Sequence, residues 1–285
     1  MLKYRLIFGL LMTAFFIGLV LFDGWLDGSA TNSITDDKPV QGTGLCILVA
    51  LVIILAQLEL SKLAAVKNIR VFTPVCIAAS IFFATSWYWR QFFEFPPVIS
   101  FFLLSVFSLF ALLLYQHRCC GTSGVLVNCG VSCLSIFYLG LLMAFVPAIR
   151  IDFGPWHLLM YVFVIKCSDI GAYTVGRLWG RHKFSPKISP GKTWEGMAGA
   201  VVAAVAVAIF FAVTCDIMTF VPAVAFGVCF AFIGQLGDLA ESMIKRDVEQ
   251  KDSSRSVPGF GGVLDIIDSP LVAAPFAYLF FIFGS

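Results

Sequence analysis

The most polar stretch of the chain lies between two apolar runs near the C-terminus, and its charged residues have spacings that suit an anion-binding site. Asp238, Glu241 and Lys245 fall at positions i, i+3 and i+7, so a helix would place them on one face. Asp265 and Asp268 lie three residues apart and would share a helical face in the same way. Carboxylates beside cations suit an anionic substrate that carries a metal ion. A solvated loop is the alternative, but ionised groups against apolar runs are costly, which favours a functional site.

A second polar stretch, residues 181–196, is strongly basic, and its prolines and glycines predict a loop rather than a helix. Such a loop fits phosphate binding. Its Gly-Lys-Thr at 191–193 resembles the end of a P-loop, but no strand precedes it and the first required glycine would fall at Pro186, so this motif is rejected. The basic residues in and beside this loop are Arg177, Arg181, Lys183, Lys187 and Lys192, against the single acid Glu195.

Two further ionisable residues, Lys166 and Asp169, lie within an apolar run and are three residues apart, so they can pair on one helical face. Ionisable residues inside a membrane span are functional candidates by default. Asp169 is therefore a candidate, either as a metal ligand or as the partner of Lys166. A buried ion pair that only holds helices together is the alternative.

Membrane-spanning helices must position these residues. The 285-residue chain is 60% hydrophobic and 13% charged, and its mean hydropathy is +0.94, whereas soluble domains carry about twice that charge fraction. We therefore predict an all-α, polytopic integral membrane protein with about nine transmembrane helices. The nine Cys residues show no zinc-site spacing, and the net charge of +2 gives no reason to expect a nucleic-acid partner. The expected spans are roughly residues 6–22, 43–60, 71–89, 98–115, 125–148, 156–175, 197–215, 220–237 and 263–283.

The positions of the cations indicate the orientation of the chain. With nine helices and the N-terminus in the cytoplasm, the outside segments hold only Lys38, Arg90 and Arg150 of the 19 Lys and Arg residues. All the others lie inside, except Lys166 within a span. The positive-inside rule favours this arrangement.

The chemistry is expected to be concentrated in one part of the chain. We interpret residues 1–120 as a transmembrane scaffold and residues 121–285 as the catalytic region, with cytoplasmic loops at 177–196 and 238–264. Glu59 lies near the end of a span, where it can reach water. The acidic segment after the first span is interpreted as a solvated connector.

The polar stretches and the span that precedes them resemble the phosphatidate cytidylyltransferase family, the CDP-diacylglycerol synthases. The resemblance covers roughly residues 165–275, and the N-terminal half matches only as generic spanning helices. It is carried by Asp169-x-x-Ala172-Tyr173-x-x-Gly176, Ser189-Pro190-x-Lys192-Thr193-x-Glu195-Gly196, Ser242-x-x-Lys245-Arg246, Lys251-Asp252, Gly259-x-Gly261-Gly262 and Asp265-x-x-Asp268.

This resemblance implies that the chain condenses CTP with phosphatidic acid, giving CDP-diacylglycerol and pyrophosphate in phospholipid biosynthesis. It also implies a magnesium requirement and a homodimer among the lipids of the inner cell membrane, with a polar cavity open to the cytoplasm. The nucleophile would be a lipid phosphate that is already anionic. Charge neutralisation and in-line positioning, without a general base, would then account for most of the catalysis.

The resemblance also suggests roles for individual residues. Magnesium prefers one or two carboxylates together with substrate phosphates and water, and we expect it on Asp238, Asp265 and Asp268. A second cation is an open possibility. Lys245 and Arg246 are expected to act in catalysis with Asp265 and Asp268. The residues expected at the substrates are Lys192, Thr193, Lys251, Arg255, Ser242 and Asp169.

Two positions depart from the family signature, because Phe260 stands where His is usual and Ile266 where Arg is usual. Arg255 lies in the same glycine-containing segment as Phe260, and we expect it to supply part of the missing positive charge. An inactive homologue is one alternative function. A CTP-dependent lipid kinase acting on a polyprenol-type alcohol is another, and an ion-coupled transporter is the alternative from a different class.

Overall fold

The computed structural model describes residues 2–29, 38–93, 96–254, 256–257 and 261–284, and these residues are predominantly helical. The helices are α1 (Leu2–Asp27), α2 (Thr43–Val66), α3 (Thr73–Ala84), α4 (Ser86–Arg90), α5 (Pro97–Cys120), α6 (Val125–Ser135), the π-helix η2 (Ile136–Leu141), α7 (Phe145–Phe153), α8 (Pro155–Trp179), α9 (Trp194–Cys215), α10 (Phe220–Asp247) and α11 (Leu264–Gly284). A short hairpin of β1 (Lys183–Ser185) and β2 (Ser189–Thr193) completes the described structure.

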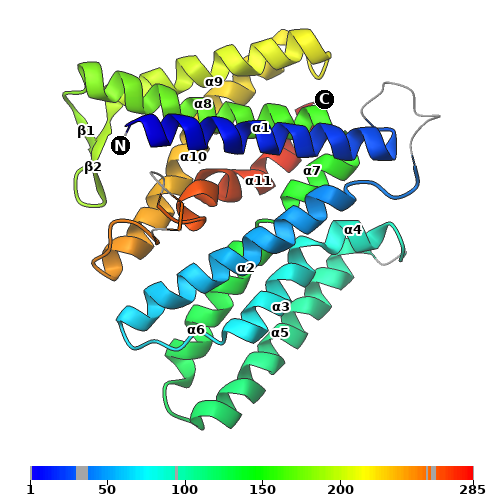
Figure 1. Cartoon of the computed structure of the whole chain (residues 1–285), viewed down its shortest axis with the longest axis vertical. Coiled ribbons are helices and arrows are strands. Elements are labelled where there is room, and N and C mark those ends of the chain that lie inside the picture. The colour runs from blue at the N-terminus through cyan, green and yellow to red at the C-terminus, as the bar shows by residue number, and fades with distance from the viewer. Residues whose placement is uncertain (1, 30–37, 94–95, 255, 258–260, 285) are drawn as a thin grey trace.

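Eight helical segments of the described residues are long and apolar enough to cross a membrane. The chain is therefore an all-α, polytopic membrane protein, as its composition predicts. The third expected span is divided, because α3 ends before Thr85 and α4 follows as a short separate helix. The count of nine crossings and the cytoplasmic N-terminus stay predictions. In Figure 1 the start of α1 lies at the left of the upper helix group and the end of α11 lies right of centre in the same group.

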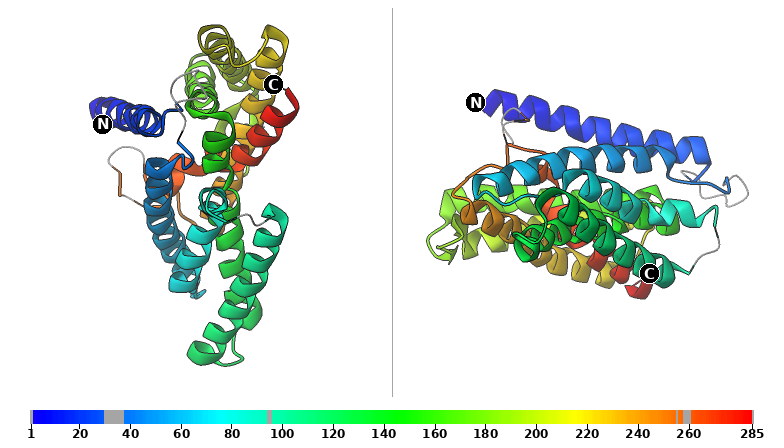
Figure 2. Two further views of the ribbon diagram at one scale, coloured as in Figure 1. Left: turned by 90° about the vertical axis from the view of Figure 1, so that its right-hand side faces the viewer. Right: turned by 90° about the horizontal axis from the view of Figure 1, so that it is seen from below.

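Two groups of helices pack around separate cores. The larger core is built mainly from α8, α9, α10 and α11, with fully buried Tyr161, Phe226 and Phe281. The smaller core joins α3, α5 and α6 around Phe83 and Leu112. Figure 2 shows the second group extending away from the first, with α1 at the periphery.

The closest helix pair of the larger group is α8 and α9, which meet at glycines. A Cβ atom on Gly171 would lie 2.5 Å from the carbonyl oxygen of Gly199, so a side chain at either position would force the helices apart. This close approach fixes α8, which carries Lys166 and Asp169, against α9 and the hairpin that precedes it.

The basic loop expected between α8 and α9 contains the antiparallel hairpin, in which Lys183 pairs with Thr193 and Ser185 with Ser189. The Thr193 hydroxyl accepts a hydrogen bond from the Gly196 backbone N–H and so caps α9. Thr193 therefore orders the start of α9. In the left part of Figure 1 the hairpin lies at the same end of the molecule as the start of α1.

Glu195 fixes the other side of this hairpin. Its carboxylate accepts hydrogen bonds from the backbone N–H groups of Arg181 and His182, and it lies 2.6 Å from His182 Nδ1. The first residues after α8 are thus held against the first turn of α9.

A buried ion cluster joins α1 to α7. Arg150 is fully buried, and its Nη2 lies 2.8 Å from Asp27 Oδ2 and 3.5 Å from Asp23 Oδ2. Asp27 also accepts the Gly42 N–H at 3.0 Å, and Asp23 accepts the Gly44 N–H at 2.6 Å. The interpretation of this acidic segment as a solvated connector is wrong for both aspartates, because they pair with a cation from a distant helix.

Candidate functional site

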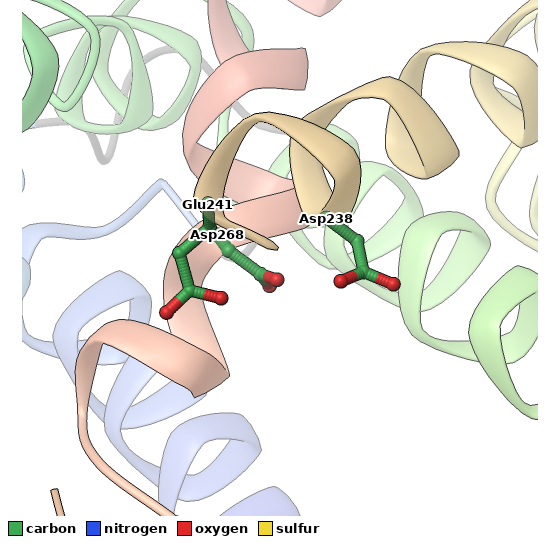
Figure 3. A group of neighbouring side chains, drawn as sticks. All are labelled: Asp238, Glu241 and Asp268. Atoms are coloured by element: carbon green, nitrogen blue, oxygen red, sulfur yellow. The ribbon is translucent and has the colours of Figure 1, made fainter. Parts of the chain in front are cut away.

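Three carboxylates from two helices form the centre of the site. Asp238 and Glu241 project from α10 and Asp268 from α11, and their ligand oxygens all lie within 4.8 Å of one another (Figure 3). Glu241 is 0% exposed and Asp268 is 5% exposed. The i, i+3 spacing predicted the first two on one face, and the structure adds Asp268 from the neighbouring helix.

The two helices can bring these acids together because α10 has a glycine at the crossing. A Cβ atom on Gly237 would lie 2.9 Å from both the carbonyl oxygen of Asp268 and the Cα of Ser269. Any side chain at position 237 would push the first turns of α11 away from α10. The residue directly before Asp238 therefore determines whether the third carboxylate can reach the other two.

Three lysines lie against the acids. Lys245 Nζ is 2.7 Å from Glu241 Oε2 and 2.6 Å from Asp265 Oδ1, so it joins α10 to α11. Lys192 of the hairpin is 2.8 Å from Asp238 Oδ2 and donates to the Gln235 carbonyl. The third, Lys166, lies on α8, and its Nζ is 4.0 Å from Asp169 Oδ2.

Asp265 lies outside the acid cluster. Besides Lys245, its carboxylate accepts hydrogen bonds from the backbone N–H and hydroxyl of Ser253 and from the N–H of Gly262. These contacts hold the segment before α11 against the first turn of that helix. The expected metal ligands were Asp238, Asp265 and Asp268, whereas the structure groups Glu241 with Asp238 and Asp268.

The second acid that orders this segment is Glu59 of α2, which sequence reasoning missed. Glu59 Oε1 accepts from the Ser254 hydroxyl at 2.6 Å and the Val263 N–H at 3.0 Å, and Oε2 accepts from the Leu264 N–H at 2.9 Å. The carboxylate thus binds N–H groups at the start of α11, which are otherwise unsatisfied at a helix N-terminus. The expectation that it reaches water is wrong, because Glu59 is 4% exposed.

The signal that could have identified Glu59 is its position within an apolar helix. It lies about two turns before the end of α2, where a carboxylate can either reach the surface or bind another part of the chain. Sequence spacing cannot choose between these outcomes, because these partners of Glu59 follow 195 to 205 residues later.

The other candidate residues surround this centre. The Ser242 hydroxyl donates to Asp238 Oδ1, and the Arg246 guanidinium donates to the carbonyls of Ile188 and Gln250. Lys251 is exposed beyond the end of α10. Arg255 and Phe260 lie outside the described residues.

On α8, Lys166 and Asp169 are 4.0 Å apart between Nζ and Oδ2, as their spacing predicted. Asp169 Oδ1 also accepts a hydrogen bond from Gln235 of α10 at 3.2 Å. Gln235 therefore connects Asp169 to Lys192, which binds the backbone carbonyl of the same residue.

A buried tyrosine of the π-helix also faces the acids. Tyr138 interacts electrostatically with Asp268, Glu241 and Asp238, and within the described part of the chain its hydroxyl has no hydrogen-bond partner. Single-turn π-helices are frequent at functional sites. No spacing in the sequence pointed to this residue.

The charges of the site leave room for a cation. Five carboxylates (Asp169, Asp238, Glu241, Asp265 and Asp268) accompany three ammonium groups (Lys166, Lys192 and Lys245), so these eight side chains carry a formal excess of two negative charges. Glu241 Oε1 is buried and has no hydrogen-bond partner among those residues. Hard oxygen ligands of this kind suit a divalent ion such as Mg²⁺.

Comparison with known proteins identifies the class. The sequence model of the cytidylyltransferase family matches residues 39–283, so the chain belongs to this family. It is 43% identical over 145 residues to a phosphatidate cytidylyltransferase of Haemophilus influenzae, covering 45% of this chain and 48% of that protein. It is 38% identical over 152 residues to one of Bacillus subtilis, covering 52% and 56%. The matches thus cover about half the length of these relatives.

Proposed function

We propose that this protein transfers a cytidylyl group from CTP to phosphatidic acid, giving CDP-diacylglycerol and pyrophosphate for phospholipid biosynthesis. The observation that carries the proposal is the cluster of Asp238, Glu241 and Asp268, surrounded by lysines, in a chain of the cytidylyltransferase family. The relatives' names support the two substrates. The apolar helices and the bacterial relatives support a location in the inner cell membrane, and the cation distribution supports a site that faces the cytoplasm.

The reaction that these residues would assist is a nucleotidyl transfer. A phosphate oxygen of phosphatidic acid attacks the α-phosphorus of CTP, the bond from that phosphorus to the oxygen bridging to the β-phosphate breaks, and pyrophosphate leaves. The nucleophile is already anionic, so the main barrier is the approach of one anion to another. Cations that neutralise the phosphates are therefore more useful here than a general base.

The lysines and the hairpin have distinct roles in this scheme. Lys192 and Arg246 lie on the hairpin side of α10, where they would hold the triphosphate. Lys245 keeps Glu241 and Asp265 in place through its two short ion pairs. Lys251, exposed after α10, would contact phosphate from the solvent side.

The carboxylate cluster fits magnesium. Asp238, Glu241 and Asp268 would hold the ion, with the unpartnered Oε1 of Glu241 as one ligand. When bound, magnesium would neutralise charge on the substrate phosphates. In this ligand set Glu241 takes the place that was expected for Asp265. The carboxylate of Asp265 instead bonds to Lys245 and to the segment before α11. The family resemblance also supports a homodimer surrounded by membrane lipids.

A labelling experiment tests the proposed reaction. The purified protein in lipid nanodiscs is given phosphatidic acid, magnesium and CTP labelled at either the α- or the γ-phosphate. We expect label from the α-phosphate to enter the lipid and label from the γ-phosphate to leave as pyrophosphate. Lipid labelled from the γ-phosphate would indicate a kinase instead. No lipid label from either position would overturn the proposal.

A further inference from the structure

A proline in α11 creates an acceptor close to the site. Pro270 lies inside the helix and has no backbone N–H, so it cannot bond to the carbonyl of Ile266 four residues earlier. Lys166 of α8 donates to that carbonyl oxygen, with an Nζ–O distance of 2.6 Å. One of the three ammonium N–H groups of Lys166 is therefore bound by the carbonyl that Pro270 leaves without its helical partner.

The three lysines of the site differ in how completely the protein pairs them. Lys245 lies 2.7 Å and 2.6 Å from two carboxylates and its side chain is 10% exposed. Lys192 lies 2.8 Å from Asp238 and is 13% exposed. Lys166 lies 4.0 Å from Asp169, the outer limit of direct pairing, and its side chain is 36% exposed. Of these three, Lys166 has the most distant acidic partner and the greatest access to a ligand.

Lys166 also lies beside the acid cluster. Its ammonium group bonds to the carbonyl of Ile266, two residues before Asp268, and lies 4.0 Å from Asp169, so an anion bound to a metal at the cluster would be close to this positive charge. We propose that Lys166 is a phosphate-binding residue, whose ammonium group contacts a phosphate oxygen of CTP or of phosphatidic acid. The inference rests on the proposed function and adds a residue from α8 to its site.

The position of Lys166 explains how the site tolerates Ile266. The signature of the family usually has Arg at this position, and Ile266 brings no charge. The backbone carbonyl of Ile266 instead holds the ammonium group of Lys166. The cation thus comes from α8, and α11 contributes the carbonyl that holds it in place.

The competing interpretation is that Lys166 only joins α8 to α11 through its contacts with Asp169 and Ile266. Both interpretations predict a stability loss when the side chain is shortened. They differ in the Michaelis constants, because a purely structural lysine has no direct effect on the affinity of one particular substrate. They differ also in rescue, since Arg can bind phosphate from this position.

The experiment compares Lys166→Met and Lys166→Arg with Lys62→Met, which removes an exposed lysine of α2 outside the site. Each protein is purified in nanodiscs, its thermal unfolding is measured, and kcat and KM are determined separately for CTP and for phosphatidic acid. We expect Lys166→Met to raise one of the two KM values about 10- to 100-fold, the effect of losing a hydrogen bond to a charged group. Lys166→Arg should restore much of the loss, and Lys62→Met should match the wild type.

The affected KM identifies the source of the phosphate. A change for CTP alone assigns Lys166 to the nucleotide, and a change for phosphatidic acid alone assigns it to the lipid. Unchanged KM values in folded Lys166→Met overturn the inference. If Lys166→Met does not fold, Pro270→Ala is used instead. The alanine introduced at this position has a backbone N–H, which can bond to the Ile266 carbonyl and so release Lys166. An unchanged KM for both substrates in that variant would also overturn the inference.

Binding measurements keep this test separate from that of the proposed reaction. If the wild type transfers no cytidylyl group, two binding measurements compare the wild type with Lys166→Met. The first measures binding of magnesium-CTP to the protein in nanodiscs. The second measures binding of the detergent-purified protein to vesicles that contain phosphatidic acid. Weaker binding of one probe by the variant supports a phosphate-binding Lys166 even if the reaction is different. Equal binding of both probes, or no binding by either protein, overturns it.

Discussion

The molecule contains two sets of charged side chains within its helices, and they differ in their access to a ligand. In the cluster of Asp23, Asp27 and Arg150, the side chains are between 0% and 7% exposed and each acid also accepts a backbone N–H. Carboxylates outnumber cations at the candidate site too, but side chains such as Asp238 and Lys166 are 35% and 36% exposed there. The first set holds helices together, whereas the second retains both charge and access for a ligand.

Contacts of both sets also cross the expected boundary of the chain at residue 120. The closed cluster joins α1 to α7, and Glu59 of α2 holds the start of α11. Residues expected to form only a scaffold therefore determine the geometry of the site. A buried charge in this protein is better classified by its partners and its exposure than by the half of the sequence in which it lies.

The largest expected effect is on the closed cluster. Arg150→Met leaves Asp23 and Asp27 buried without their cation, and breaking such a pair typically costs about 3–5 kcal/mol. We expect a clearly lower midpoint of thermal unfolding in detergent, measured by intrinsic fluorescence. The control is Arg90→Met, which removes an exposed arginine and should leave the midpoint unchanged. An unaltered midpoint in Arg150→Met would contradict the structural role of the cluster.

The open cluster should respond in activity instead. Asp268→Asn removes a charge from the proposed magnesium site, and we expect turnover to fall about 100-fold or more, since even the outer partners of metal ligands typically contribute 10- to 100-fold. The midpoint of unfolding should change little. Asp247→Asn is the matched control, because the side chain of Asp247 is 68% exposed and pairs with Lys67 at the surface. Near-normal turnover of Asp268→Asn at low magnesium would remove Asp268 from the ligand set.

Glu59 lies between these two extremes, because it is buried like the closed cluster but contacts the segment that borders the site. Glu59→Gln replaces one acceptor oxygen by an N–H₂ group facing donors from Val263 and Leu264. We expect about a tenfold loss of turnover, from weaker hydrogen bonds to a formerly charged acceptor. Hydrogen exchange should become faster at the start of α11. Glu249→Gln, at an exposed position after α10, is the control, and equal exchange rates in Glu59→Gln and wild type would contradict this role.

The sequence predicted the parts of the site that depend on local spacing. The periodicity of α10 placed Asp238, Glu241 and Lys245 on one face, and the spacing in α8 paired Lys166 with Asp169. Contacts between distant segments could not be predicted in this way. Asp265 and Asp268 have the same residue type and share a helix, and only the crossing of α10 and α11 directs one to Lys245 and the other to the acid cluster.

The fold shows the same limit. Hydropathy identified the spans, because each spanning helix needs about 20 apolar residues, but it did not show the break at Thr85 between α3 and α4. The prolines and glycines of 181–196 predicted a loop, whereas the hairpin depends on Glu195 and Thr193 holding its two ends. The hairpin thus depends on hydrogen bonds between side chains and backbone groups, which hydropathy and loop composition do not show.

The smallest predicted effect concerns Tyr138, which has features of both sets of charges. It is buried, yet its hydroxyl has no partner among the described residues, and it interacts with the three clustered acids. If the hydroxyl is only an unsatisfied group, Tyr138→Phe should raise the midpoint of unfolding and leave turnover unchanged, because removing such a group relieves a cost of burial. We expect the other result, a three- to tenfold loss of turnover, about the value of one neutral hydrogen bond to a substrate or water oxygen. Tyr115→Phe in the smaller core is the control for loss of a hydroxyl. Full turnover in Tyr138→Phe would assign this tyrosine to the structural set and confine the open site to its charged residues.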